Sequence, residues 1–306
     1  MSTRLSVSVS EDFLYEALVG DEGLDVLRWD LEGPAPREAI DLVVPDYLAP
    51  KSRLANLVGV RSRLVQSQMI GYDGVAALLP PGVVYANAAS VHETSTAELA
   101  LALVLAAQRG LPDFVRAAEL GRWAFDYYPS LADKRVLLLG YGGVGRAIEA
   151  RLAPFEVDVV RVAHRARVAE TGPVHGVGEL GALLPHADVV IVSLPLTAET
   201  HHLVDATFLA AMADHSLFVN VGRGPVVATE DLVACAATGR LRVALDVVEP
   251  EPLPEGHPLY SMPNVLISPH VGGATSAMRP RVLRLIATQI ERLRRGEEPL
   301  NVVLRT

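Results

Sequence analysis

The sequence predicts an α/β protein with two doubly wound parallel sheets, and three observations lead to that prediction. Strand patterns alternate with helix patterns along the chain, as in parallel sheets covered by helices. The strands after residue 135 are almost continuously apolar, which is expected where both faces of a sheet are covered. A length of 306 residues suits two domains, each with its own core.

Five short strands are expected in the first 90 residues, separated by helical or turn segments. They are Leu5–Val9, Val26–Trp29, Leu42–Val44, Leu64–Gln66 and Val83–Tyr85. A long helix follows from about Thr94 to Arg109, and either Thr94 or Ser95 is the expected N-cap. Its apolar content predicts burial on more than one side, as in a domain connection or a subunit interface.

A second set of elements begins at Val136. The expected strands are Val136–Leu139, Val157–Val162, Val189–Ser193, Leu217–Asn220, Val243–Asp246 and Val265–Ser268. Helices are expected over Thr207–Ala213, Thr229–Gly239 and about Thr275–Arg295, and a last strand over Leu300–Leu304.

A glycine-rich turn joins the first strand of the second set to a helix and predicts a dinucleotide site. Gly140 permits a tight turn, Gly142 lets the backbone approach phosphates, and Gly145 lets helix and strand pack closely. The first amides of such a helix face a pyrophosphate. The remaining expected cofactor contacts in this turn are Tyr141, Gly143 and Val144.

The end of the next strand favours NADP over NAD. A domain that prefers NAD places an acidic residue there, to bind the ribose hydroxyls. This chain instead has His164, Arg165 and Arg167, and a guanidinium suits a 2′-phosphate. Asp158 stands near the start of the strand, where we expect a solvated or salt-bridged residue.

Composition and charge indicate which kinds of binding partner and which cellular compartment to expect. A net charge of −9 argues against a general nucleic-acid or anionic-membrane surface. The single cysteine, Cys235, suits a reducing compartment. The alternating start, LSVSVS, is not a signal-peptide pattern, and the apolar run Leu99–Ala107 is too short to span a bilayer. We therefore expect a cytoplasmic protein.

Three further segments carry residues suited to catalysis, each just beyond a predicted strand. Arg223 stands between two glycines, Glu251 lies in an acidic, proline-stiffened loop, and His270 precedes a pair of glycines. Histidine holds and releases a proton near neutral pH, and arginine grips a carboxylate with two bonds. A carboxylate bonded to the imidazole should raise the histidine pKa.

We predict no metal site. His201 and His202 are adjacent rather than spaced by one helical turn, and they lie in a polar loop. The pattern predicts a solvent-exposed pair.

Taken together, these segments resemble the D-isomer-specific 2-hydroxyacid dehydrogenases over essentially the whole chain. The matching motifs, in the family's order, are Gly-Tyr-Asp-Gly at 71–74, the glycine turn, SLPLTAET at 193–200, NVGRG at 220–224, ALDVVEPEP at 244–252 and SPHVGG at 268–273. The resemblance implies that Arg223 holds the substrate carboxylate, His270 is the general acid/base and Glu251 its acidic partner. Glu249 is the competing carboxylate, but the family places its glutamate before the second proline of this loop.

The resemblance also implies further contacts. Backbone amides of Ile70 and Gly71 are expected to hold the substrate carboxylate, and Asp246 looks like the family's aspartate near the nicotinamide ring. The other implied cofactor contacts are Thr94, Leu194, Pro195, Thr200, Val221, Gly222 and Gly272.

The implied architecture is a Rossmann dinucleotide-binding domain, residues 94–274, inserted in a flavodoxin-like substrate domain, residues 1–93 and 275–306. Hinge motion is then expected near residues 92–96 and 272–276. A homodimer is implied as well.

The implied activity is NADPH-dependent reduction of a short 2-oxo acid to the D-2-hydroxy acid. The segment AASVHETSTAELALALVL is most similar to glyoxylate and hydroxypyruvate reductases. Ile70 replaces the lysine of phosphite-oxidising relatives, and Glu251 replaces the glutamine of formate-oxidising ones, which disfavours both chemistries. A phosphoglycerate dehydrogenase and a nucleotide-sensing, corepressor-like interaction protein remain as alternatives.

Overall fold

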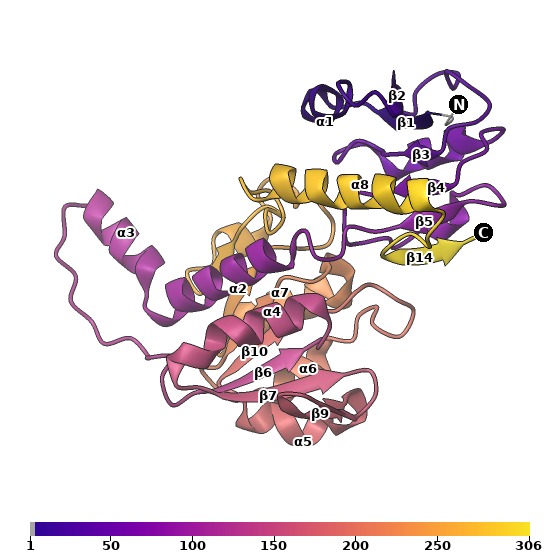
Figure 1. The fold of residues 1–306 in the computed structure, drawn as a ribbon. Helices are drawn as coiled ribbons and strands as arrows, with labels where there is room; N and C mark the ends of the chain where they lie inside the picture. The colour runs from indigo at the N-terminus through magenta and orange to yellow at the C-terminus, as the bar shows by residue number, and fades with distance from the viewer. Residues whose placement is uncertain (1–3) are drawn as a thin grey trace. The chain divides into compact units, whose positions relative to one another are not determined.

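The computed structural model describes residues 4–306, which form two compact units (Figure 1). Unit 1 comprises the residues up to His92 together with Ser276–Thr306, and unit 2 is Glu93–Thr275. Residues 1–3 of the predicted substrate domain lie outside the described residues. The substrate and cofactor roles assigned to the two domains stay predictions at this point.

Unit 1 is built on a six-stranded sheet with the order β14-β5-β4-β3-β1-β2. The strands are β1 Leu5–Val9, β2 Leu24–Arg28, β3 Leu42–Val43, β4 Leu64–Gln66, β5 Val84–Ala86 and β14 Val302–Arg305. The first five run parallel in the order 2-1-3-4-5, which is a doubly wound arrangement. Only β14, at the edge, is antiparallel to its neighbour.

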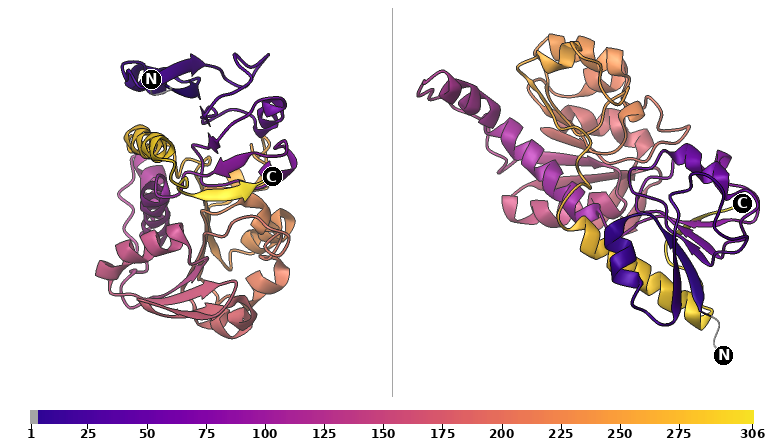
Figure 2. Two further views of the ribbon diagram at one scale, coloured as in Figure 1. Left: turned by 45° about the vertical axis from the view of Figure 1, so that its right-hand side comes forward. Right: turned by 90° about the horizontal axis from the view of Figure 1, so that it is seen from above.

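The helices of unit 1 cover this sheet. They are α1 Asp12–Leu18 and α8 Met278–Arg295, with 3-10 turns at Lys51–Leu57 and Val75–Ala77. Helices α1 and α8 lie side by side (Figure 2), and α8 buries one apolar stripe that includes Val282, Ile286 and Leu293. The start of α8 was expected at Thr275, but that residue belongs to unit 2, where its hydroxyl bonds Ser95 at 2.9 Å.

Unit 2 is built on an eight-stranded sheet with the order β13-β12-β11-β10-β6-β7-β9-β8. The strands are β6 Arg135–Leu139, β7 Asp158–Ala163, β8 Arg167–Ala169, β9 Gly172–Gly176, β10 Val189–Val192, β11 Leu217–Asn220, β12 Arg242–Leu245 and β13 Val265–Ile267. All ladders are parallel except β8–β9. The order around β6 is that of a dinucleotide-binding sheet, so the predicted fold class is confirmed.

The helices of unit 2 are α2 Glu93–Gln108, α3 Leu111–Glu119, α4 Gly143–Leu152, α5 Leu180–Leu183, α6 Ala206–Ala211 and α7 Thr229–Ala237. Helix α2 contacts α4, β11 and β12, and its buried residues spread over several faces, as predicted. Its start at Glu93 places Thr94 and Ser95 inside the first turn, so the prediction that one of them is the N-cap is wrong. The Ser95 hydroxyl is instead bonded to Thr275.

Helix α1 lies in a segment for which either a helix or a turn was expected, whereas α3, α5 and the β8–β9 hairpin were not predicted from the sequence. The hairpin strands are three and five residues long and carry mostly polar or small side chains, so they lack an apolar run. Helix α3 buries none of its residues. Within residues 4–306, no helix has both the length and the apolar character that crossing a membrane requires.

Candidate active site

The candidate catalytic residues of unit 2 follow the carboxyl ends of adjacent strands. Leu139, Val192, Asn220, Leu245 and Ile267, the last or nearly last residues of five neighbouring strands, stand in one row across the sheet. Open parallel sheets bind ligands in the crevice outside these ends. The loop that follows each strand therefore starts at the same edge of unit 2.

The loop that carries Arg223 is shaped by the last residue of β11. The Asn220 side chain accepts a hydrogen bond from the Gly222 amide at 3.0 Å and donates to the Arg223 carbonyl at 3.1 Å. A Cβ on Gly224 would lie 1.8 Å from the Val248 carbonyl oxygen, so only glycine lets this loop abut the loop after β12. The Arg223 guanidinium donates to the Gly222 carbonyl at 2.7 Å.

Glu251 and His270 form a hydrogen-bonded ion pair. The His270 Nδ1 atom lies 2.7 Å from Oε2 of Glu251. The other carboxylate oxygen, Oε1, accepts from the Val248 amide at 3.1 Å. The side chains remain 43% and 36% exposed, so a small molecule can reach them.

Each partner changes the pKa of the other. The hydrogen bond to Glu251 raises the pKa of His270 above its ordinary value, against burial and the charge of Arg223, which lower it. Burial acts to raise the pKa of Glu251, but the His270 hydrogen bond and the charges of His270 and Arg223 outweigh it and lower that pKa. The pair therefore favours the ionised carboxylate and the protonated imidazole over their neutral forms. Arg223 acts electrostatically on both.

Asp246 fixes the loop that carries His270. Its buried carboxylate accepts hydrogen bonds from the Ser268 hydroxyl at 2.7 Å and from the amides of Val271 and Gly272, both at 2.9 Å. The His270 amide also donates to the Asp246 carbonyl at 2.7 Å. His270 has φ +53°, a left-handed conformation that is unusual for histidine, and these bonds hold it there.

The glycine turn fits a dinucleotide. Gly140 has φ +107°, and a Cβ on Gly145 would lie 2.1 Å from the Gly140 carbonyl oxygen, so both positions require glycine. A Cβ on Gly142 would meet no atom within 4 Å, which leaves space beside the turn. Helix α4 begins at Gly143, and the first amides of a helix have no acceptor within it.

Tyr141, an expected cofactor contact, has its side chain buried inside unit 2. Its hydroxyl is hydrogen-bonded to Glu149 and lies 2.6 Å from the Thr171 hydroxyl, so only its main chain remains for a cofactor. The Arg161 Nε atom donates to Glu149 at 2.8 Å, which ties β7 to α4. Sequence reasoning missed Glu149 and Arg161, and the only signal was one acidic residue on an otherwise apolar helix face.

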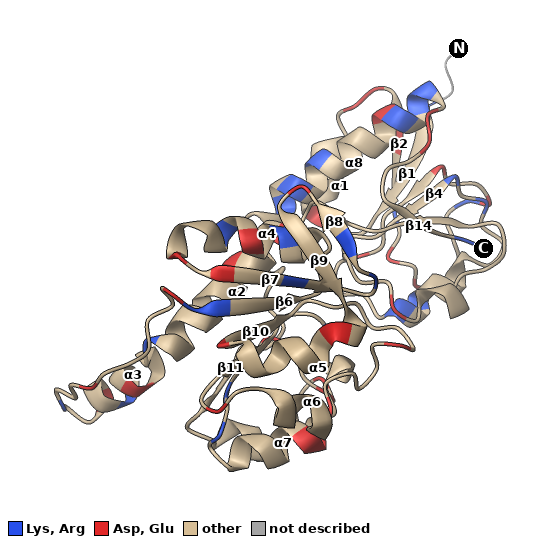
Figure 3. Cartoon of the chain, turned by 90° about the horizontal axis from the view of Figure 1, so that it is seen from below, with Lys and Arg blue, Asp and Glu red and all other residues tan. Residues whose placement is uncertain are grey.

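Of the three basic residues expected to favour NADP, two lie in the bend after β7 and one lies in the next strand. His164 and Arg165 are exposed in the bend that follows the strand, whereas Arg167 lies in β8 and donates to the Tyr141 carbonyl at 2.9 Å. Figure 3 shows basic residues around β7 and β8. Asp158, at the other end of β7, pairs with Arg135 at 2.8 Å, as expected for a residue at the start of the strand.

The remaining expected cofactor contacts of unit 2 lie in the loops at the same edge. The Thr200 hydroxyl donates to the Pro195 carbonyl at 2.7 Å, which closes the loop after β10 on itself. A Cβ on Gly222 would lie 2.7 Å from the Leu194 carbonyl oxygen, so these two loops touch. The others are Val221, buried after β11, Gly272, packed against Asp246 and Thr96, and Thr94, in the first turn of α2.

Ile70 and Gly71 follow β4 in unit 1. The Ile70 carbonyl accepts from the Asn87 side chain at 2.8 Å, which fixes the backbone of this loop. Both residues are half-buried.

Comparison with known proteins gives consistent matches. A model described as "D-isomer specific 2-hydroxyacid dehydrogenase, NAD binding domain" matches residues 101–272. A glyoxylate reductase/hydroxypyruvate reductase of Mus musculus is 30% identical, with 92% of this chain and 91% of that protein covered.

Two solved structures are similar along the whole chain. A D-isomer specific 2-hydroxyacid dehydrogenase of Xanthobacter autotrophicus Py2, in complex with NADPH and MES, has a TM-score of 0.82 and 31% identity, covering 99% of this chain and 98% of that one. An NADPH-dependent glyoxylate/hydroxypyruvate reductase of Sinorhizobium meliloti, in complex with NADP and sulfate, has a TM-score of 0.83 and 26% identity, covering 98% of both.

Asp246→Asn is expected to loosen the His270 loop. An amide offers one acceptor oxygen where the carboxylate offers two, so one of the buried N–H groups now bonded to Asp246 loses its acceptor, at a cost of about 1–3 kcal/mol. Hydrogen exchange of the amides at 270–272 measures this as faster exchange. Asp158→Asn, in an exposed ion pair, is the control and should cost less than about 1 kcal/mol. Unchanged exchange in Asp246→Asn would contradict the role given to the carboxylate.

Proposed function

The chain belongs to the D-isomer specific 2-hydroxyacid dehydrogenase family, and from that membership we propose that it reduces a short 2-oxo acid to the D-2-hydroxy acid with NADPH. The observation that carries the proposal is the 2.7 Å contact between His270 and Glu251, with the charge of Arg223 acting on both. Similarity to glyoxylate/hydroxypyruvate reductases supports glyoxylate or hydroxypyruvate as the substrate.

Reduction of a 2-oxo acid needs a hydride at the carbonyl carbon and a proton at the carbonyl oxygen. When bound, the reduced nicotinamide supplies the hydride. His270 gives its proton to the oxygen, and Arg223 binds the substrate carboxylate and stabilises the charge that grows on the oxygen. In the oxidative direction, the same imidazole receives the proton.

Glu251 favours the protonated form of His270 and fixes the orientation of its ring. Its negative charge favours the imidazolium, and its bond to Nδ1 turns Nε2 toward the substrate. The Val248 amide holds the carboxylate in place through its second oxygen. Glu251 is thus proposed as the positioning and charge-stabilising partner of the proton donor.

The cofactor is proposed to bind at the glycine turn. The first amides of α4 would hold the pyrophosphate, and the exposed Arg165 and His164 would meet a 2′-phosphate. Within this proposal unit 2 is the dinucleotide-binding domain. Unit 1 is the substrate domain, and the amides of Ile70 and Gly71 are its donors to the substrate carboxylate.

Substitutions at two positions test the catalytic roles. Arg223→Ala is expected to lower kcat/KM for glyoxylate and hydroxypyruvate by about 10³-fold. Arg223→Lys should lower it by less, because lysine keeps the positive charge but cannot donate two parallel hydrogen bonds to a carboxylate. His270→Gln should lower kcat by about 10²–10⁴-fold. NADPH binding, followed by fluorescence, should survive in all three variants.

The control is His175→Gln, which breaks the exposed His175–Glu179 pair of the same 2.7 Å length. It should leave turnover unchanged. The assay panel includes a phosphorylated 2-oxo acid. Near-normal turnover in Arg223→Ala and His270→Gln, or no turnover of any 2-oxo acid by the wild type, would contradict the proposal.

The rate of reduction should depend on pH through His270. Its pKa is raised above 6.5, so the proton donor is present below that pKa and is lost as pH rises through it. The alkaline limb of kcat/KM should therefore lie above pH 6.5 in wild type and move to lower pH in Glu251→Gln. A limb that stays in place in that variant would show that another group titrates.

Cofactor choice depends on the bend after β7. Arg165→Ala should lower kcat/KM for NADPH by about tenfold, the loss of one charge-assisted hydrogen bond, and leave NADH almost unaffected. Arg135→Ala, at the other end of the same sheet region, is the control. A wild type that prefers NADH, or an unchanged preference in Arg165→Ala, would refute the NADP assignment.

We also propose that the protein is a homodimer and that α3 with the segment after it forms part of the interface. This region of unit 2 exposes large apolar side chains: Leu111, Phe114, Val115, Leu120, Trp123, Phe125 and Tyr127. Figure 1 shows α3 reaching away from the sheet of its unit. A second copy of the chain would cover this apolar surface.

Light scattering after size exclusion tests the assembly. The wild type should elute with twice the chain mass, and Phe114→Glu with Trp123→Glu should give a folded monomer, because two buried charges destabilise an apolar interface. Leu48→Glu changes an exposed leucine of unit 1, outside the proposed interface, and should stay dimeric. A dimeric double variant would exclude α3 from the interface.

A further inference from the structure

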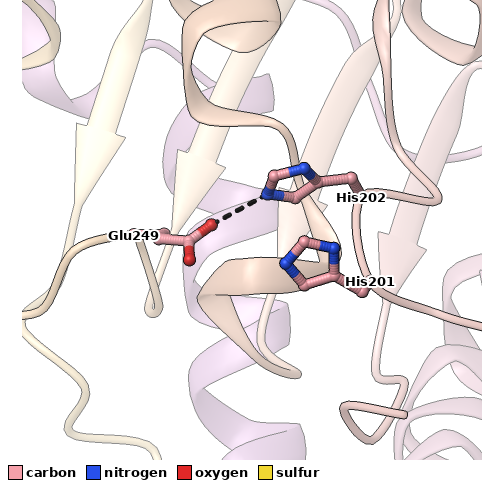
Figure 4. A group of neighbouring side chains, drawn as sticks. All are labelled: His201, His202 and Glu249. Carbon is pink, nitrogen blue, oxygen red and sulfur yellow. Dashed lines mark hydrogen bonds and ion pairs between the residues drawn. The ribbon is translucent and has the colours of Figure 1, made fainter. Parts of the chain in front are cut away.

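A cluster of two histidines and one glutamate lies on the surface of unit 2, apart from the proposed reaction groups. The side chains of His201, His202 and Glu249 each offer one ligand atom, and these atoms lie within 4.8 Å of one another. The imidazole rings are stacked, with centroids 3.9 Å apart. Figure 4 shows a nitrogen of each ring turned toward the Glu249 carboxylate. The prediction of no metal site rested on the adjacent histidines alone and did not consider Glu249, which stands 47 residues beyond His202.

The spacing of these atoms suits a shared cation. The Nε2 atom of His202 lies 3.0 Å from Oε2 of Glu249. Two ligands that each bind one tetrahedral zinc ion at about 2.0–2.2 Å are about 3.3–3.6 Å apart, slightly farther than this contact. A cation can therefore replace the shared proton if the two side chains separate by a few tenths of an ångström, and the ligand atom of His201 lies within 4.8 Å of both. We propose that His201, His202 and Glu249 bind a divalent transition-metal cation such as Zn²⁺.

The backbone already holds the three residues in place. The His202 amide donates to the Pro225 carbonyl at 2.9 Å, and the His201 amide donates to the Thr197 carbonyl at 3.0 Å. On the other side, the Thr229 hydroxyl donates to the Glu249 carbonyl at 2.7 Å. Because these segments are ordered in advance, binding the cation costs little additional conformational entropy.

The donor set selects the class of cation. Two imidazoles and one carboxylate suit zinc, nickel or copper, whereas magnesium and calcium prefer oxygen ligands alone. Three protein ligands leave a position for water. The second histidine distinguishes this cluster from an ordinary His–carboxylate pair. His175 and Glu179 also form such a pair, at 2.7 Å, but they offer only two ligands.

A bound cation would join two loops of unit 2. His201 and His202 lie in the segment between β10 and α6, and Glu249 lies in the segment that follows β12, two residues before Glu251. The cation would therefore act as a cross-link that stabilises the folded unit. This inference is independent of the proposed reaction, since none of its three ligands is a proposed reaction group.

Calorimetric titration of the full-length, tag-free protein with ZnCl₂, after treatment with EDTA, tests the site. One ion should bind per chain, and the midpoint of thermal unfolding should rise in its presence. His202→Ala and Glu249→Gln should each weaken binding more than about tenfold, because each removes a direct ligand. His201→Ala should weaken it as well. MgCl₂ should give no binding heat at the same concentrations.

His175→Ala and His270→Gln are the matched controls and should bind Zn²⁺ as the wild type does. Equal affinity in wild type and His202→Ala would overturn the proposal, and so would a loss of binding in His270→Gln, which would place the ion at the Glu251–His270 pair. Turnover of the EDTA-treated protein is measured in parallel. Retained turnover with no zinc binding would refute only the metal site, and zinc binding without turnover would refute only the proposed reaction.

Discussion

The structure of the site depends on one contact, the 2.7 Å hydrogen bond between Glu251 and His270. The two residues come from loops after different strands, so the contact exists only because β12 and β13 are parallel neighbours whose ends stand in register. Without the carboxylate, burial and the charge of Arg223 would both lower the pKa of His270. With it, the pKa of His270 is raised despite the charge of Arg223.

Other parts of unit 2 serve to keep that contact in place. Asp246 uses its buried carboxylate to hold the loop in which His270 adopts a left-handed conformation. Gly224 lets the Arg223 loop approach Val248, whose amide in turn binds Glu251. The three proposed reaction residues are therefore linked through contacts between neighbouring loops.

Much of this could be predicted because it depends on local patterns. Continuous apolar runs located the central strands, and β11 has the predicted bounds, Leu217–Asn220. The role of each glycine in the turn before α4 could be predicted separately, because each position requires glycine or open space for its own steric reason.

The features that could not be predicted depend on residues that come into contact only in the folded chain. The Tyr141–Glu149–Arg161 network and the His202–Glu249 contact join side chains that are distant in sequence, and they leave no periodic signal. The N-cap prediction for α2 was wrong because the helix begins at Glu93, and the Ser95 hydroxyl bonds Thr275, a partner 180 residues away.

The most direct test of the account is the pKa of His270, measured by NMR on protein with isotope-labelled histidine. The account predicts a pKa above 6.5 in wild type and a lower value in Glu251→Gln, because the carboxylate is the main cause of the increase. The His175 resonance provides an internal reference that the substitution should not move. A wild-type pKa of His270 at or below 6.5, or one that Glu251→Gln leaves unchanged, would contradict the central role of this pair.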